Sequence, residues 1–191
     1  MKKILFFAVL LACTVFTACE KEEIGGTATE SMAGQWYVTV DAVDESGNPI
    51  EGGEDYFGIG KVLFFTYNTS ANSENEMWID DRGEFDLASA YSYGAYPSYS
   101  IKSKVTVNQD ALTFFASNAE NNADENAYGS ELYNVDVEGK ILKGAGTQNN
   151  GSKADSIVIF VSYKNDPWYP DDGYAKYKIS GIRYSGLVEN D

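Results

Sequence analysis

Histidine is absent from all 191 residues of the sequence. This absence excludes Ser-His-Asp and Cys-His catalysis, because both use an imidazole as the general base. It also excludes the usual histidine-ligated zinc sites. Any catalysis would have to depend on carboxylates, lysine, tyrosine or a serine-lysine pair, and no spacing in the sequence singles out such a set.

Cysteine is almost as scarce, because the chain has only Cys13 and Cys19. Both lie in a segment typical of a signal peptide, in which Lys2 and Lys3 precede an apolar run over 4–16. That run is too short to span a bilayer, which needs roughly 20 residues. We therefore expect cleavage before Cys19, whose position resembles the acylated cysteine of bacterial lipoproteins. Loss of Cys13 and acylation of Cys19 would leave the mature chain without disulfides.

Basic side chains are outnumbered, with 14 lysines and arginines against 29 acidic residues and a net charge of −15. Removal of 1–18 takes away Lys2 and Lys3 and leaves 12 basic and 29 acidic side chains, a net charge of −17. Such a balance repels phosphate backbones. We expect no nucleic acid partner.

The residues after Cys19 are Glu20, Lys21, Glu22 and Glu23. They resemble the acidic export signal with which Bacteroides-type lipoproteins reach the outer face of the outer membrane. The alternatives are a plain solvated tether and a location on the periplasmic face. The sequence divides into three expected parts: a lipoprotein signal peptide (1–18), a lipidated acidic tether (19–33) and one domain (34–191).

The domain shows the two-residue period of β-strands. Trp36, Val38 and Val40 alternate with more polar residues, and over 99–107 the apolar positions alternate with Lys102 and Lys104. No window outside the signal repeats apolar residues at helical spacing. Nine strands are expected, near 36–41, 60–67, 77–79, 99–107, 112–115, 131–137, 140–142, 156–163 and 174–182. Turn residues join them, and Glu138-Gly139 is expected to form a two-residue hairpin loop. Short strands without helices favour a sandwich or a closed antiparallel barrel.

Three stretches carry a resemblance to a known family: Thr66-Tyr67-Asn68-Thr69 leading to Met77-Trp78-Ile79-Asp80-Asp81, then Asp155-Ser156-Ile157, and the tail 180–186. Together they resemble the lipid-binding putative hydrolase family of Bacteroides-type lipoproteins, over nearly the whole of 34–191. The resemblance implies an all-β fold, a single lipocalin-like, calycin-type barrel of about 8–10 strands with a cavity. It also implies a lipid or another hydrophobic small molecule as the ligand. We expect no cofactor.

Aromatic residues are the candidate ligand contacts. Three lie on expected strands and would form either the core or a cavity wall. Four lie in segments rich in glycine or proline, where they would cover the barrel mouth, stack on a sugar or plug the core. The seven are Trp36, Phe64, Trp78, Tyr91, Tyr93, Tyr96 and Trp168.

Two acidic pairs, Asp80-Asp81 and Asp171-Asp172, could in principle divide acid and base roles. Each is followed closely by glycine, and neighbouring residues on a strand point to opposite faces, so we expect solvated turns. The acids around Trp168 match no EF-hand calcium loop, and no metal site is predicted.

Three functional classes remain open. The leading one is an acyl-anchored protein that binds a lipid or another hydrophobic molecule without catalysis. The second is a surface adhesion or glycan-binding protein, and the third is a hydrolase that works without histidine. A continuous cavity would favour the lipid-binding class, a filled barrel with a flat aromatic ledge the adhesion class, and carboxylates converging in a cleft the hydrolase.

Overall fold

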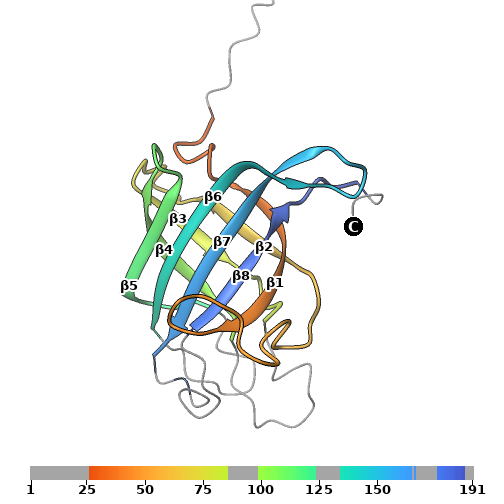
Figure 1. Cartoon of the computed structure of the whole chain (residues 1–191). Coiled ribbons are helices and arrows are strands. Elements are labelled where there is room, and N and C mark those ends of the chain that lie inside the picture. Colours follow the sequence, from red (N-terminus) through yellow and green to blue (C-terminus); the bar gives the residue numbers. More distant parts are fainter. Residues whose placement is uncertain (1–25, 86–98, 124–133, 165, 167–175, 188–191) are drawn as a thin grey trace, which may run out of the picture.

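The structure, a computed structural model, describes residues 26–85, 99–123, 134–164, 166 and 176–187. Eight antiparallel strands, each paired with its neighbours along the chain, close into a barrel (Figure 1). The strands are β1 (Gly34–Val43), β2 (Val62–Asn68), β3 (Glu76–Asp80), β4 (Lys102–Asn108), β5 (Thr113–Ala119), β6 (Val135–Thr147), β7 (Lys153–Tyr163) and β8 (Lys176–Arg183). The closed antiparallel barrel is confirmed over the sandwich, and the described residues contain no helix.

Alternation along each strand decides which side chains face the interior. In β1, Trp36, Val38 and Val40 are buried, and in β4 Val105 and Val107 are buried while Lys104 is exposed. Both patterns agree with the prediction, since successive side chains of a strand point to opposite faces. None of the described residues belongs to a helix that is long and apolar enough to cross a bilayer.

The barrel closes where β1 pairs with β8, in a register that runs from Trp36 opposite Arg183 to Val43 opposite Lys176. Gly181 makes this close approach possible, because a Cβ at that position would lie 2.0 Å from the carbonyl oxygen of Tyr37. Closure leaves no strand edge open to another chain.

The hairpin expected at Glu138-Gly139 is wrong. β6 continues through both residues, and the turn to β7 comes later, over 148–152. Gly139 serves another purpose, because a Cβ there would lie 2.1 Å from the ring of Phe114. The glycine therefore provides space for that ring on the neighbouring strand β5.

The two ends of the barrel differ in their connections. Short segments, 69–75, 109–112 and 148–152, join strands at one end, which we call the closed end. The longer segments 44–61, 81–101, 120–134 and 164–175 join strands at the other, which we call the loop-bearing end. The chain enters the barrel at the closed end, at the top of Figure 1.

Part of the expected tether is folded onto the closed end. The backbone amide of Ala28 donates to Asn72 Oδ1 over 2.9 Å, and Thr29 Oγ1 donates to Asn68 Oδ1 over 3.1 Å. Thr29 and Met32 are fully buried. The flexible spacer predicted up to residue 33 is therefore too long, because the chain contacts the barrel from Ala28 onward.

Candidate functional site

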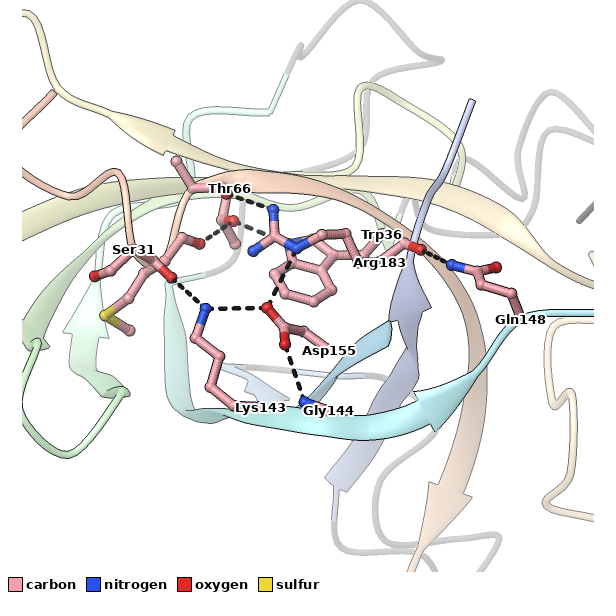
Figure 2. Close-up of polar contacts among 10 residues, drawn as sticks. Ser31, Trp36, Thr66, Lys143, Gly144, Gln148, Asp155 and Arg183 are labelled. Carbon is pink, nitrogen blue, oxygen red and sulfur yellow. Dashed lines mark hydrogen bonds and ion pairs between the residues drawn. The ribbon is translucent and has the colours of Figure 1, made fainter. Parts of the chain in front are cut away.

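A chain of hydrogen bonds fills the closed end (Figure 2). Trp36, which is fully buried, donates its indole N–H to Thr66 Oγ1 over 2.9 Å. That hydroxyl in turn donates to the carbonyl oxygen of Met32 over 2.6 Å. The buried indole N–H of Trp36 and hydroxyl of Thr66 are thus paired inside the protein, which avoids the cost of leaving them unsatisfied.

Arg183 covers the ring of Trp36, with its guanidinium carbon 4.5 Å from the ring centroid. It donates to the carbonyl oxygen of Ala33 over 2.8 Å and lies 3.5 Å from a carboxylate oxygen of Asp155. Lys143 contacts the same carboxylate oxygen at 3.0 Å (Figure 2). Stacking, hydrogen bonding and ion pairing by one planar guanidinium hold the N-terminal turn against the last strand.

Asp155 is held in its ionised form by this network. Burial alone would raise the pKa of its carboxyl group, but the hydrogen bonds from Lys143 and from the amide of Gly144, together with the charges of Lys143 and Arg183, lower it below the ordinary value. A ligand entering through the closed end would have to break these contacts. The closed end is therefore a structural plug.

The middle of the barrel is filled by inward side chains, so the cavity that the family resemblance implies does not lie there. Phe64 is fully buried, as is Trp36 nearer the plug, so both of these predicted contacts belong to the core. Phe114, Ile141, Ile157 and other apolar residues pack with them.

Aromatic rings gather at the loop-bearing end. We call this group the aromatic cluster; it consists of Phe57, Phe85, Tyr99, Tyr163 and Tyr177. The ring centroids lie 4.9 Å apart for Phe57 and Tyr99, 5.2 Å for Phe57 and Tyr177, and 5.3 Å for Tyr99 and Tyr163. All five rings are buried, in the tilted and edge-to-face arrangements that aromatic rings prefer. The cluster also meets the core, since Phe85 stacks on Phe64 at 6.1 Å.

A carboxylate joins the tyrosines of the cluster. Tyr99 donates its hydroxyl to Asp166 Oδ1 over 2.7 Å, and Tyr177 donates to Asp166 Oδ2 over 2.9 Å. The hydroxyl of Tyr163 donates to the carbonyl oxygen of Tyr99 over 2.5 Å. Burial, and then the charges of Asp81 and Asp166, raise the pKa of Tyr163 well above its ordinary value. The cluster therefore has a polar centre of hydroxyl groups around one carboxylate.

Asp81 fixes the base of the segment that joins β3 to β4. Its Oδ1 accepts from the amides of Gly83 (3.2 Å) and Ile101 (3.0 Å), and its Oδ2 accepts from the amide of Phe85 (2.8 Å). Burial raises its pKa to about 6, against the opposing effect of these three hydrogen bonds. Asp81 thus links the two ends of the segment and places Phe85 in the cluster.

The prediction of a solvated turn at Asp80-Asp81 is wrong, because both residues are buried. Asp80 accepts from the hydroxyl of Tyr67 over 2.6 Å and from the amide of Arg82 over 2.8 Å. The carboxylates of Asp80 and Asp81 thus accept hydrogen bonds from different partners and do not share a binding position. The described residues hold no group of three acids that could bind a metal ion.

Trp78 lies on the outer wall, so its predicted place in the interior is wrong. Met77 and Ile79 take the inward positions of β3, while the ring of Trp78 is half-buried beneath Lys104, at 5.4 Å, and Lys102, at 6.0 Å. Tyr91, Tyr93, Tyr96, Trp168 and the pair Asp171-Asp172 lie outside the described residues.

A groove of about 680 Å³ lies near the loop-bearing end and reaches the aromatic cluster, since Tyr163, Tyr177 and Asp166 are among the residues that line it. Phe115 and Phe160 line it together with Glu138, Lys176 and the ion pair of Asp136 with Lys164. Phe115 is 56% exposed, an unusual position for a large apolar side chain. The groove therefore connects the outer wall around Phe115 with the polar centre of the aromatic cluster.

The aromatic cluster was missed by sequence reasoning, apart from the inward position of Tyr99. Tyr177 and Ile179 alternate on β8, so strand periodicity could have identified Tyr177 as inward. Phe57, Phe85 and Asp166 lie on connecting segments, where no periodic signal exists.

A search of curated proteins finds no match. A family model, described as lipid-binding putative hydrolase, matches residues 21–188 and so covers the barrel, the plug and the loop-bearing end. The chain belongs to the lipid-binding putative hydrolase family.

Proposed function

We propose that the protein binds a lipid or another hydrophobic small molecule at the loop-bearing end of the barrel and does not transform it. The observation that carries the proposal is the aromatic cluster, which lies opposite the plug in a member of a lipid-binding family. Ligand sites are typically apolar and aromatic with a few polar groups that fix orientation, and the tyrosines around Asp166 have that character.

Hydrolysis is the less favoured activity because its usual groups are missing or engaged. The sequence has no histidine. Asp80 and Asp81 are buried in hydrogen bonds to their own segment, and the pair is not directed at a shared substrate position. A binding role needs none of these groups to act as acid or base.

Two measurements test the proposal. Native mass spectrometry of the chain purified from its host should detect a bound hydrophobic molecule. A monoacylglycerol with a diazirine in its acyl chain should, after irradiation, label peptides that contain Phe57, Tyr99 or Tyr177. Labelling of Phe115 and Phe160 alone would move the site to the outer groove, and absence of saturable labelling would refute lipid binding.

We also propose that the mature protein is an outer-membrane lipoprotein attached through Cys19, with the loop-bearing end directed away from the membrane. Gly26, where the described chain begins at the closed end, is seven positions after Cys19, and a chain of that length reaches at most about 25 Å. β7 alone has 11 residues, so the tilted barrel is about 28 Å tall. The tether is too short to turn the loop-bearing end onto the bilayer.

Cys19→Ala should abolish incorporation of labelled palmitate, and retained label would disprove the anchor. Replacement of Glu20, Lys21, Glu22 and Glu23 with alanine should protect the protein from external protease if they direct surface exposure. Unchanged cleavage would contradict that role, whereas protection of the unmodified protein would indicate the periplasmic face.

A second candidate function is glycan or surface adhesion through the outer groove. The exposed ring of Phe115, beside Glu138 and Phe160, is the observation that favours it. Glycan-array binding that is lost in Phe115→Ser, with lipid binding unchanged, would establish this function.

A further inference from the structure

The described residues of the loop-bearing end are rich in negative charge. The described parts of the four segments that join strands there contain nine acidic residues and three basic ones. The connections of the closed end, together with the N-terminal turn, contain three acidic residues: Glu30, Glu74 and Asp110. A field of one sign around an opening raises the local concentration of opposite charges and repels like charges.

Two of the three basic residues of these segments lie on the outer wall, and the third, Lys164, lines the groove that also contains Asp166. Lys61 lies over the ring of Tyr37, Arg82 lies over Phe65, and Lys164 pairs with Asp136. Tyr37, Phe65 and Asp136 occupy the outward positions of β1, β2 and β6. Among the described residues, the polar groups in contact with the aromatic cluster are the carboxylates of Asp81 and Asp166 and the tyrosine hydroxyls, while Lys164 in the neighbouring groove is paired with Asp136.

Two carboxylates border the aromatic cluster from within. Asp166 accepts from Tyr99 and Tyr177, and Asp81 lies at the base of the segment that carries Phe85. The raised pKa of Tyr163 has the charges of both carboxylates among its causes, so both act on the same side chain of the cluster. Charge interactions are stronger in such buried surroundings than in water.

We infer that the ligand site selects molecules with a neutral or cationic polar group, such as an alcohol, an ester, an amide or an amine, and discriminates against carboxylates and phosphates. This inference rests on the proposed function, since it assigns the class of ligand bound by the aromatic cluster. A ligand alcohol or amine can donate to Asp166, whereas an ionised fatty acid would face two like charges. Free fatty acids bind poorly to this site at neutral pH.

Three amphiphiles that share one tail test the inference. Dodecanol, dodecylamine and dodecanoate are titrated at pH 7.5, below their aggregation limits, against residues 20–191, which contain the complete closed barrel. The alcohol and the amine should bind at least about tenfold more tightly than the carboxylate, as repulsion between like charges at partly buried sites predicts. Equal or tighter binding of dodecanoate would overturn the inference while supporting the proposed function. Binding of none of the three would refute both.

A matched pair of variants tests whether the preference for dodecanol over dodecanoate arises at Asp166. In Asp166→Asn, the affinity for dodecanol divided by the affinity for dodecanoate should fall by about threefold or more, while dodecanol still binds. Asp110→Asn makes the same change of charge at an exposed turn of the closed end and should leave the ratio unchanged. Equal narrowing in the two variants would mean that net charge alone is responsible, which would contradict a charge effect within the site.

Discussion

The closed end and the loop-bearing end of the barrel treat buried charge differently. At the closed end Asp155 is paired with Lys143 and Arg183, and its pKa is lowered. At the loop-bearing end Asp81 has backbone amides as its partners, and its pKa is raised to about 6. The comparison indicates that one end is optimised for stability, while the other accepts an electrostatic cost beside a cluster of aromatic rings.

The largest expected difference concerns Trp36 in the plug. Trp36→Ala should lower the free energy of unfolding by about 3–5 kcal/mol, because it removes a fully buried ring and leaves the partners Thr66 and Arg183 without it. Urea unfolding measures the loss, and Trp36→Phe serves as the milder variant. Ligand affinity of the folded variant should remain within about twofold of the unmodified protein. A cost below about 1 kcal/mol would show that the plug contributes little.

The second prediction concerns pH and the loop-bearing end. The pKa of Asp81 is about 6 in the folded protein against an ordinary value of 3.8, so its stabilising contribution is complete below pH 4 and is lost as the pH rises through 6. The stability of the unmodified protein relative to Asp81→Asn should fall by roughly 2–3 kcal/mol between pH 4 and pH 7. Urea unfolding of both proteins at each pH gives this difference, and a constant difference would contradict the raised pKa.

Arg183 provides a smaller test at the closed end. Arg183→Met should cost about 1–2 kcal/mol, since the hydrogen bond to Ala33 and the contact with Asp155 are lost while the aliphatic cover of Trp36 is partly kept. Because the pKa of Asp155 is lowered, the stability from this pair should disappear as the pH falls below about 4, the opposite sign to Asp81. Thermal unfolding at pH 3 and pH 7 distinguishes the two behaviours. An Arg183→Met cost that is as large at pH 3 would be inconsistent with an ionic contribution.

The smallest effect is expected on the outer wall. Phe115→Ser should change the free energy of unfolding by less than about 0.5 kcal/mol, because the ring is largely in solvent. Lipid affinity, measured by displacement of a neutral fluorescent probe, should also stay the same. A clear loss of affinity would place the lipid site in the groove.

The alternation of apolar and polar residues sufficed to predict the barrel, but it identified only some of the side chains that face the interior. Strands such as β1 and β4 alternate cleanly, so Val38 and Val105 could be placed from the sequence. In Met77-Trp78-Ile79 every residue is apolar, and alternation could not decide the inward face. The position of Trp78 is explained by Lys102 and Lys104 on the neighbouring strand, which cover its ring.

The polar centre of the site depends on contacts that no local pattern reports. Tyr99 and Asp166 are 67 positions apart and meet because the barrel closes. Gly139 resembled a turn residue, although its role is to make room for Phe114 across the strand pair. Asp81 likewise resembled part of a solvated turn. Its burial could not be predicted, because it results from packing by segments that are distant in the sequence.

Hydrogen exchange measured with and without a bound neutral lipid tests the central claim most directly. The account predicts slower exchange in peptides over 55–58, 81–85, 99–101 and 163–166, with no change over 27–36, 143–155 and 183–187 at the opposite end. Protection that is confined to those closed-end peptides, or to the outer wall around Phe115, would contradict a ligand site in the aromatic cluster.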